Sequence, residues 1–391
     1  MSRIERILVH PVSVPLRRPF VTAVRSTRQL ETVLVHLVDT DGASGWGEAP
    51  ASWRVTGESV ASITAAVAGP LTEAVVGRDP ADLDELTTRI AAAVVRNSSA
   101  RSAIDCAVHD LAAQRAGLPL QAFLSGRAAD RATATATGIT TDMTISAGAD
   151  RDRLVADALE QLAAGFRTLK IKVGAGGGDL DGVRAVRDAV GPDVGLRVDA
   201  NQAWSTGEAI EIIRAWEETG VALEFVEQPV AARELDALQA VTAEVGTPIL
   251  ADESVWDAGD LREIIHRRAA DAVNLKLAKT GGLTAARSMA AAAARASMGV
   301  IVGCMMESTV GIGAAAALAG SLGDLTAARP QDLDAGLWLA DAAVAGGATY
   351  SGDRILLPAE PGAGVAGLRM PDPGHGIAGL RPPAPAAGGS R

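Results

Sequence analysis

The sequence predicts an α/β protein in which a closed barrel of alternating strands and helices follows a smaller α+β domain. Two observations support this prediction. Residues 3–50 form β-branched runs that precede helical segments, whereas short apolar runs alternate with amphipathic segments from about residue 132 onward. Such alternation is typical of parallel βα units. Seven or eight units within about 200 residues favour a closed barrel over an open sheet.

In the first domain, the β-branched runs RILVHPVSV and TVLVHLVDT are predicted strands, and DTDG at 39–42 marks a turn. Helical spacing follows between residues 58 and 116, where the last predicted helix ends at a glycine. The predicted barrel strands are 132–139 onward, 168–173, 194–200, 223–229, 248–254, 272–279 and 299–305, with a weaker eighth strand near 333–339.

A chain of 391 residues is long enough for two domains. We assign residues 1–130 to the N-terminal α+β domain and residues 131–344 to the barrel. The segment from about 345 to 380 is expected to pack back on the first domain. The Pro/Gly/Ala-rich residues 381–391 are expected to be disordered.

Composition limits the possible partners and the compartment. The net charge of -11 argues against a nucleic-acid partner, which would need a basic face. No apolar stretch long enough for a membrane span and no signal-peptide pattern is present. The two cysteines, Cys106 and Cys304, form no C-x-x-C pair and cannot make a disulfide framework, so we expect a cytoplasmic protein.

Charged side chains stand at the ends of five consecutive predicted strands. They are Lys172, Asp199, Glu227, Asp252 and Lys276, which follow one another at intervals of 24 to 28 residues. Because each interval is one βα unit, the five side chains are expected to converge on the mouth of the barrel where catalytic groups stand.

The three acids among them would repel one another unless a cation bound between them. Oxygen ligands without His or Cys favour a hard ion, Mg²⁺ first and Mn²⁺ second. The alternative is that Asp199, Glu227 and Asp252 are ordinary strand-end acids that cap helices or face solvent. That alternative suits any one acid better than three acids in step with flanking lysines.

Lys172 and Lys276 are predicted on strands that lie across the barrel from each other. Two facing amines suit the removal of a proton from one face of a carbon and its return on the other. A useful lysine base needs a pKa about 3 units below its ordinary 10.4, and both Lys170 and the cation are expected to lower it. Structural ion pairs with the carboxylates are the alternative.

Together these motifs resemble the muconate-lactonizing subgroup of the enolase superfamily. The resemblance rests on K-x-K at 170–172, D-A-N at 199–201, E-Q-P at 227–229, D-E-S at 252–254, the N-x-K-x-x-K-x-G-G run from Asn274, GWGEAP at 45–50 and VTGES at 55–59. It covers nearly the whole chain. It implies a modified (β/α)7β TIM-type barrel with an α+β capping domain, and an assembly of identical chains.

The resemblance also implies roles for individual residues. Lys172 and Lys276 are expected to be the acid/base pair, and Asp199, Glu227 and Asp252 the ligands of Mg²⁺. Lys170 is expected to tune Lys172. Asn201 and Glu253 are expected to orient the ligands. Proton removal next to a substrate carboxylate would give an enediolate, whose reprotonation yields epimerisation and whose loss of a β-group yields elimination.

Four residues near the ends of the last predicted barrel strands bear on the substrate. Asp332 and Asp334 form a D-x-D of the kind with which dipeptide epimerases of this subgroup bind the free α-ammonium, although the flanking QDLDAG lacks the aromatic residues expected there. An exposed acidic turn is the alternative. Cys304 and Met306 are expected to line the pocket, with no nucleophilic role for the thiol because no base partner is evident.

Arg25, in the run TAVR, resembles a residue of epimerases selective for an acidic C-terminal residue, where its guanidinium could clamp a carboxylate. A solvated loop arginine is the alternative. The function expected from the resemblance is therefore a dipeptide epimerase, most like the L-Ala-D/L-Glu type. N-acylamino acid racemase, o-succinylbenzoate synthase and muconate-type cycloisomerase remain alternatives, as does a non-catalytic ligand-binding barrel.

Overall fold

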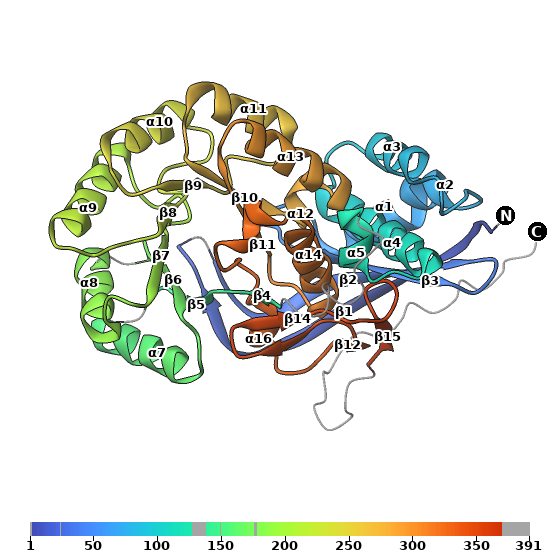
Figure 1. The fold of residues 1–391 in the computed structure, drawn as a ribbon, viewed down its shortest axis with the longest axis horizontal. Coiled ribbons are helices and arrows are strands. Elements are labelled where there is room, and N and C mark those ends of the chain that lie inside the picture. The colour runs from blue at the N-terminus through green and yellow to red at the C-terminus, as the bar shows by residue number, and fades with distance from the viewer. Residues whose placement is uncertain (1, 24, 127–137, 149, 176–177, 370–391) are drawn as a thin grey trace, which may run out of the picture.

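The N-terminal part of the chain is an antiparallel sheet covered by helices. The computed structural model describes residues 2–23, 25–126, 138–148, 150–175 and 178–369. The sheet has the order β1 (Ile4–Val21), β2 (Ser26–Asp39) and β3 (Ser44–Pro50). Its helices are α1 (Val60–Ala66), α2 (Thr72–Val75), α3 (Leu83–Ala93), α4 (Ser98–Ala116) and α5 (Leu120–Ser125), and a π-helical turn over Val67–Leu71 joins α1 to α2 (Figure 1).

The central strand β2 buries side chains on both of its faces, which explains how the sheet joins the two parts of the molecule. Val33 and Val35 of β2 pack into a cluster with the helices α1 to α4, whereas Leu30 and Leu34 belong to the large cluster that includes the barrel. Successive side chains of a strand point to opposite faces. The predicted strand TVLVHLV therefore supplies apolar residues to two cores at once.

Glycines of β3 let helix α4 lie directly on the sheet. A Cβ atom at Gly47 would stand 1.9 Å from the carbonyl oxygen of Ala103, and one at Gly45 would stand 2.1 Å from that of Ala107. Any larger residue would force the helix away. The GWGEAP run is thus explained on one face by close packing against α4.

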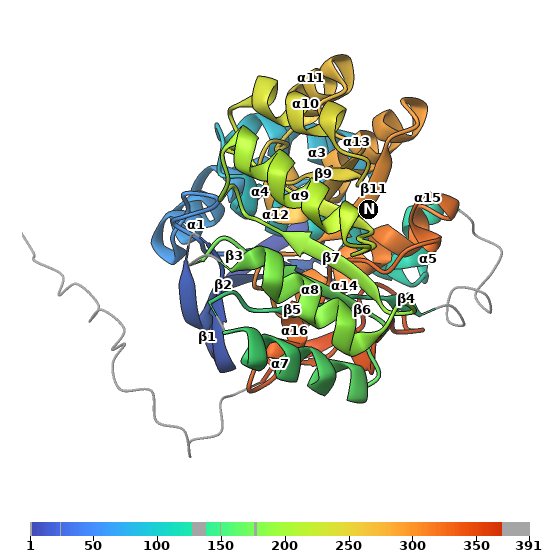
Figure 2. The same cartoon turned by 90° about the vertical axis from the view of Figure 1, so that its left-hand side faces the viewer.

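The second part is a parallel barrel whose helices lie outside its strands (Figures 1 and 2). Seven strands pair in chain order, namely β5 (Met143–Ile145), β6 (Thr168–Lys172), β7 (Gly195–Asp199), β8 (Phe225–Glu227), β9 (Ile249–Ala251), β10 (Ala272–Lys276) and β11 (Gly299–Gly303). The helices between and after them are α7 (Arg151–Ala163), α8 (Asp179–Val190), α9 (Thr206–Glu218), α10 (Leu235–Glu244), α11 (Ala258–Arg267), α12 (Leu277–Thr280), α13 (Leu283–Arg295), α14 (Thr309–Ser321), α15 (Asp324–Ala327) and α16 (Ala335–Trp338).

A two-residue segment closes the ring between the first and last strands. Gln331 forms a parallel bridge with Thr141, just before β5, and Asp332 forms one with Gly303 at the end of β11. The Gln331 side chain adds a bond, since its Oε1 accepts from the Val302 amide at 2.8 Å. The predicted (β/α)7β barrel with an α+β capping domain is confirmed.

Two strand predictions at the ends of the barrel differ from the structure. The weak eighth strand near 333–339 is wrong, because the closing bridges lie at 331–332 and helix α16 follows. The predicted first strand at 132–139 lies mostly outside the described residues. The short β4 (Ile139–Thr140) pairs with the C-terminal β14 (Arg354–Leu356), and β5 is the first barrel strand.

The C-terminal segment returns to the N-terminal part of the chain. β12 (Val344–Gly346) pairs with β15 (Val365–Leu368), and β13 (Thr349–Ser351) pairs with β14. Between them, the Ala363 amide donates to Asp110 of α4 at 2.6 Å. The predicted disordered tail at 381–391 lies outside the described residues.

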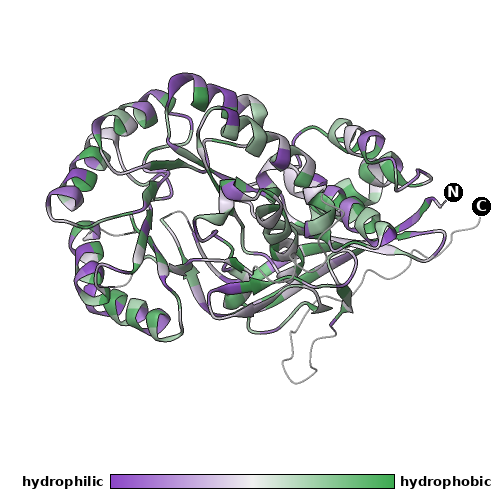
Figure 3. Cartoon of the chain, in the orientation of Figure 1, coloured by the Kyte–Doolittle hydropathy of each residue, from purple (hydrophilic) through white to green (hydrophobic). Residues whose placement is uncertain are grey.

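Apolar residues are concentrated on the strands and on the inward faces of the helices, as Figure 3 shows. Within the described residues, no helix combines the length and the apolar character that crossing a membrane requires.

Candidate active site

Each of the five charged residues stands at or directly after the carboxyl end of a barrel strand. Lys172, Asp199, Glu227 and Lys276 are the last residues of β6, β7, β8 and β10, and Asp252 follows β9. All five are buried, with Asp199 and Glu227 fully inaccessible to solvent. The carboxyl ends of the strands in a parallel barrel meet at one mouth. The fold therefore brings these five side chains together, although they are far apart in the sequence.

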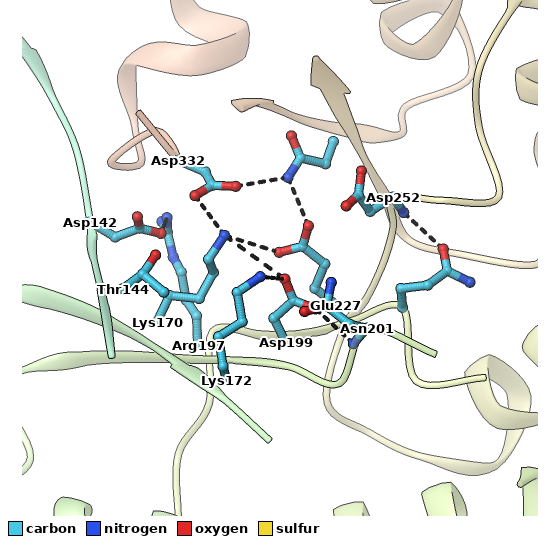
Figure 4. A network of polar contacts seen from close by, with 12 residues as sticks. Asp142, Thr144, Lys170, Lys172, Arg197, Asp199, Asn201, Glu227, Asp252 and Asp332 are labelled. Atoms are coloured by element: carbon cyan, nitrogen blue, oxygen red, sulfur yellow. Dashed lines mark hydrogen bonds and ion pairs between the residues drawn. The ribbon is translucent and has the colours of Figure 1, made fainter. Parts of the chain in front are cut away.

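Figure 4 shows Lys170 and Lys172 pointing toward carboxylates at this mouth. Nζ of Lys172 lies 2.5 Å from Oδ2 of Asp199. Across the barrel, Nζ of Lys276 lies 2.8 Å from Oδ2 of Asp252 and 3.8 Å from Oε1 of Glu227. The ion pairs that the sequence left as an alternative are therefore present. They also place two amines on opposite sides of one cluster of acids.

Lys170 faces the same cluster from a position two residues before Lys172. Its Nζ lies 2.6 Å from Asp332, 3.6 Å from Glu227 and 4.0 Å from Asp199. The ammonium is almost completely buried. Burial lowers the pKa of Lys170, but the carboxylates of Asp332 and Glu227 outweigh burial, and its net pKa is well above its ordinary value. Lys170 is therefore a fixed positive charge beside the site.

The acids themselves respond unequally to burial. Burial and the adjacent Asp199 raise the pKa of Glu227 to about 8, although Lys170 opposes the shift. Burial would also raise the pKa of Asp252, yet the ammonium groups of Lys276 and Lys279 bring it below its ordinary value. Glu227 and Asp252 thus do not share charge equally, as expected where like charges crowd together.

The pKa of Lys276 moves opposite to the expectation from the sequence. Burial lowers it, but Asp252 and Glu227 outweigh burial, so the net pKa lies well above the ordinary value. A base at this position must have a lower pKa. Charge taken up by a cation bound to the same carboxylates would provide that decrease.

The acid cluster has the chemistry of a hard-cation site. In the described part of the chain, no three acidic, histidine or cysteine side chains form a ready-made cation site, and lysine ammonium groups contact all three acids. The donor set is nonetheless entirely carboxylate oxygen, which suits Mg²⁺. Oε2 of Glu227 is buried without a hydrogen-bond partner, so the residues fit the ion once the ammonium groups give way.

Asn201 and Glu253 lie beside this cluster and touch each other. The Asn201 amide nitrogen Nδ2 donates to Glu253 at 3.1 Å, and the Asn201 backbone amide donates to Asp199 at 2.9 Å. One oxygen on each of these two side chains is buried without a partner. Burial and the nearby Asp252 raise the pKa of Glu253 to about 7.

Sequence reasoning assigned no role to three residues that complete the cluster. Nζ of Lys279 donates to Oδ1 and to the backbone carbonyl of Asp252, each at 2.5 Å. Asn274 donates to Glu227 at 2.8 Å and to Asp332 at 3.1 Å. Both belong to the N-x-K-x-x-K motif, which was the signal available. Arg197 lies two residues before Asp199 and had no such signal.

One pocket collects most of the residues that the sequence singled out, and it encloses about 630 Å³ of empty space, part of it open to solvent. Its lining includes Lys170, Lys172, Lys276, Asn201, Asp252, Glu253, Asp332, Asp334, Arg25, Cys304 and Met306. Asp199 and Glu227 contact these lysines from beneath.

The D-x-D segment is buried, which rules out an exposed acidic turn. Asp334 accepts from the Thr144 amide at 2.8 Å and from Nε1 of Trp338 at 3.1 Å. Burial and Asp332 raise the pKa of Asp334. Trp338 is the aromatic neighbour that the flanking sequence lacked. It stands four residues later on α16 and lines the pocket with Phe20.

The capping domain closes the pocket from the other side. Nη1 of Arg25 donates to Ser52 at 2.9 Å, and burial lowers the pKa of this guanidinium. Val55 of the next loop also lines the pocket, whereas Trp53 is 74% exposed. Burial raises the pKa of the Cys304 thiol well above its ordinary value, which disfavours a thiolate nucleophile.

A closed parallel barrel with lysines and acids at its strand ends, covered by an antiparallel sheet, defines the class of capped β/α-barrel enzymes. Residues 4–125 match the mandelate racemase/muconate lactonizing enzyme N-terminal domain, and residues 153–368 match the enolase C-terminal domain-like family. The chain belongs to the mandelate racemase/muconate lactonizing enzyme family of the enolase superfamily.

Several relatives of known activity are similar over nearly their whole length. The L-Ala-D/L-Glu epimerase of Bacillus subtilis is 39% identical over 370 residues, which cover 94% of this chain and 98% of the relative. The hydrophobic dipeptide epimerase of Enterococcus faecalis is 35% identical over 357 residues, covering 90% and 96%.

Solved structures of such enzymes superpose closely. A substrate-liganded structure of the L-Ala-D/L-Glu epimerase from Bacillus subtilis has a TM-score of 0.89 at 38% identity, covering 94% of this chain and 100% of that one. A dipeptide epimerase from Methylococcus capsulatus, complexed with Mg and the dipeptide L-Arg-D-Lys, has a TM-score of 0.83 at 33% identity, covering 93% and 99%.

Proposed function

We propose that this protein is a Mg²⁺-dependent epimerase of dipeptides that inverts the carbon next to the C-terminal carboxylate. One observation carries the proposal. Two lysines at the ends of β6 and β10 flank three buried carboxylates in a pocket that also contains two further buried acids. The relatives named above act on dipeptides, which supports the same substrate class here.

The reaction needs only a proton to move. The amine of Lys172 or Lys276 removes the α-proton from one face, and the ammonium of the opposite lysine delivers a proton to the other face of the same carbon. No other bond breaks, so the product has the same constitution. Asp199, Glu227 and Asp252 would hold Mg²⁺, with Mn²⁺ as second choice. When bound, the ion would stabilise the negative charge that develops on the substrate carboxylate.

The two acids of the D-x-D favour a dipeptide over an N-acylated amino acid. Asp332 and Asp334 line the same pocket as the capping domain's Arg25, and an α-ammonium group would find two carboxylates there. N-acylamino acid racemases, o-succinylbenzoate synthases and cycloisomerases do not need such a pair. Arg25 would receive an acidic C-terminal side chain, as in an L-Ala-D/L-Glu epimerase.

Proton NMR in D₂O with Mg²⁺ and a set of L,L-dipeptides that includes Ala-Glu tests the proposal. We expect loss of the α-proton signal of the C-terminal residue, incorporation of deuterium by mass spectrometry, and no exchange after treatment with EDTA. Asp334→Asn should weaken dipeptide turnover. Exchange only in N-succinyl amino acids, or turnover only of a cyclohexadiene acid, would contradict the dipeptide assignment.

The remaining proposals concern partners and location. We infer that the chain assembles with copies of itself, as expected from the family. The net charge of -11 disfavours a nucleic-acid partner, and we propose no membrane partner. The two cysteines are both free thiols. They are the basis for proposing a cytoplasmic location.

A further inference from the structure

One buried acid of the capping domain reaches across to the barrel. Glu48 stands on β3, on the face opposite to Gly47, and is 4% exposed. Its Oε1 accepts from the Ser308 amide at 2.8 Å, and its Oε2 accepts from the Ser308 hydroxyl at 2.6 Å and from the Gly311 amide at 2.9 Å. All three donors belong to the first turn of α14 or to the residue that caps it.

A second buried acid meets Glu48 at the same place. A Cβ atom at Gly311 would stand 2.1 Å from Oε2 of Glu307 and 3.2 Å from Oε2 of Glu48, so this glycine makes room for both carboxyls. Oε1 of Glu307 accepts from the Met305 amide at 2.8 Å. Together the two acids connect β3 of the capping domain to the chain between β11 and α14.

The charge at this contact is balanced within a small set of groups. Burial and the neighbouring Glu48 raise the pKa of Glu307 to about 8, and the Lys276 ammonium opposes that shift. The charge of Glu307 also contributes to raising the pKa values of Cys106, Cys304 and Tyr350. Two carboxyls this close retain a proton near neutral pH, while the amino end of α14 stabilises the remaining negative charge.

The segment held by these acids forms one wall of the substrate pocket. Cys304, Met305 and Met306 line the pocket. Met305 and Met306 also line an adjoining recess that contains Arg25 and Ser52. The contacts therefore run from Glu48 to Ser308, and through Glu307 to the backbone of Met305, at the place where a substrate side chain would lie.

We propose that Glu48 is a positioning residue that fixes Met305 and Met306 through Ser308 and Glu307, and so sets the preference of the pocket for the C-terminal side chain of the substrate. The specificity part of this inference rests on the proposed dipeptide epimerase function. The positioning part concerns the shape of the pocket and needs no turnover.

The chain offers a matched control for mere attachment of the two domains. Asp105 of α4 also reaches from the capping domain to a barrel helix, since it accepts from the backbone amide of Thr284 at 3.1 Å and from its hydroxyl at 2.7 Å at the start of α13. Neither Asp105 nor Thr284 lines the pocket. Removing the charge of Asp105 should disturb the contact between the two domains without changing the contacts of residues 304–308.

The test compares Glu48→Gln with Asp105→Asn in the full chain. Glutamine keeps one acceptor oxygen and turns an NH₂ group toward amide donors. Methyl-¹³C labelling of the seven methionines reports on Met305 and Met306 without any substrate. We expect both signals to shift in Glu48→Gln and to stay in place in Asp105→Asn.

Kinetics with two dipeptides that differ in their C-terminal side chain give the second readout. We expect their ratio of kcat/KM to change about tenfold in Glu48→Gln, the scale that one methylene group sets in a pocket, and by no more than about twofold in Asp105→Asn. If Glu48→Gln does not fold, Ser308→Ala removes only the hydroxyl donor and serves in its place.

Unchanged Met305 and Met306 signals in Glu48→Gln would overturn the proposal, as would an unchanged specificity ratio in an active enzyme. If the wild-type protein turns over no dipeptide, the proposed function is overturned. Shifted Met305 and Met306 signals in Glu48→Gln would then still support the positioning role of Glu48.

Discussion

Replacing Arg197 by methionine should destabilise the barrel far more than the loss of an exposed arginine. Arg197 is fully buried inside the barrel; its Nη1 lies 2.8 Å from Asp142, and its Nε lies 2.7 Å from Glu224. Asp142 is also fully buried, and one of its oxygens already has no partner. Removing one partner of such a pair costs about 3–5 kcal/mol, because a buried charge is left uncompensated.

The expected change in melting temperature follows from the size of the chain. At about 2.1 cal/mol/K per residue, 391 residues give an unfolding entropy of about 0.8 kcal/mol/K. A loss of about 4 kcal/mol therefore lowers Tm by about 5 °C. Arg214→Met is the control, since the Arg214–Glu244 pair is about half exposed and such pairs contribute up to about 1 kcal/mol.

The effect should also depend on pH. Burial, with Asp332 nearby, raises the pKa of Asp142 to about 7 even with Arg197 present. Without Arg197 this pKa rises further, so protonation relieves the uncompensated charge at low pH. Relative to wild type, the Arg197→Met variant therefore loses less stability at pH 6 than at pH 8. Thermal unfolding by circular dichroism measures both values. A Tm loss no larger than that of Arg214→Met, or one independent of pH, would refute this reasoning.

Three further predictions test the catalytic pair, the domain packing and a buried acid. Lys172→Ala and Lys276→Ala should each abolish epimerisation, a loss of at least about 10²-fold; each variant should still exchange the α-proton of one epimer in D₂O, and exchange of both epimers by either variant would contradict the two-base assignment. Gly47→Ala should prevent stable folding, because its Cβ would stand 1.9 Å from a backbone oxygen of α4, and a soluble variant with an unchanged Tm would contradict that packing. Burial raises the pKa of Asp110 to about 7, so its ionisation removes about 4 kcal/mol of stability as pH rises from 4 through 7. Asp110→Asn lacks this loss. The free energy of unfolding in urea should therefore fall for wild type relative to the variant over that range.

The parts of the fold that sequence could predict are those with a strong local pattern. In TLKIK and AVNLK, apolar residues alternate with polar residues, and each segment ends in a lysine. This local pattern predicts a barrel strand, and both segments are buried strands in the structure. The closing segment had no such pattern. Two residues, Gln331 and Asp332, make the bridges, and the polar Gln331 side chain replaces what a longer strand would provide.

Long-range contacts were the other limit. The local contact between Trp338 and Asp334 was missed for another reason, because a strand was predicted where the helix α16 turns Trp338 back toward Asp334. The pKa of Lys276 depends on acids from two other strands, and Glu48 bonds to a helix that begins more than 250 residues later. Local spacing places a side chain on a strand end, but the charges and donors around it come from the tertiary structure.

The two-residue closure of the barrel has a consequence for synthesis on the ribosome. Without Gln331 and Asp332, β5 and β11 would be the unpaired edges of an open sheet, and open edges invite association with other chains. At about 5–20 residues per second, the interval between the emergence of β11 and that of Asp332 lasts a few seconds. The same step that removes both edges also brings Asp332, the first acid of the D-x-D, to the pocket, so closure of the barrel and formation of the pocket depend on one residue.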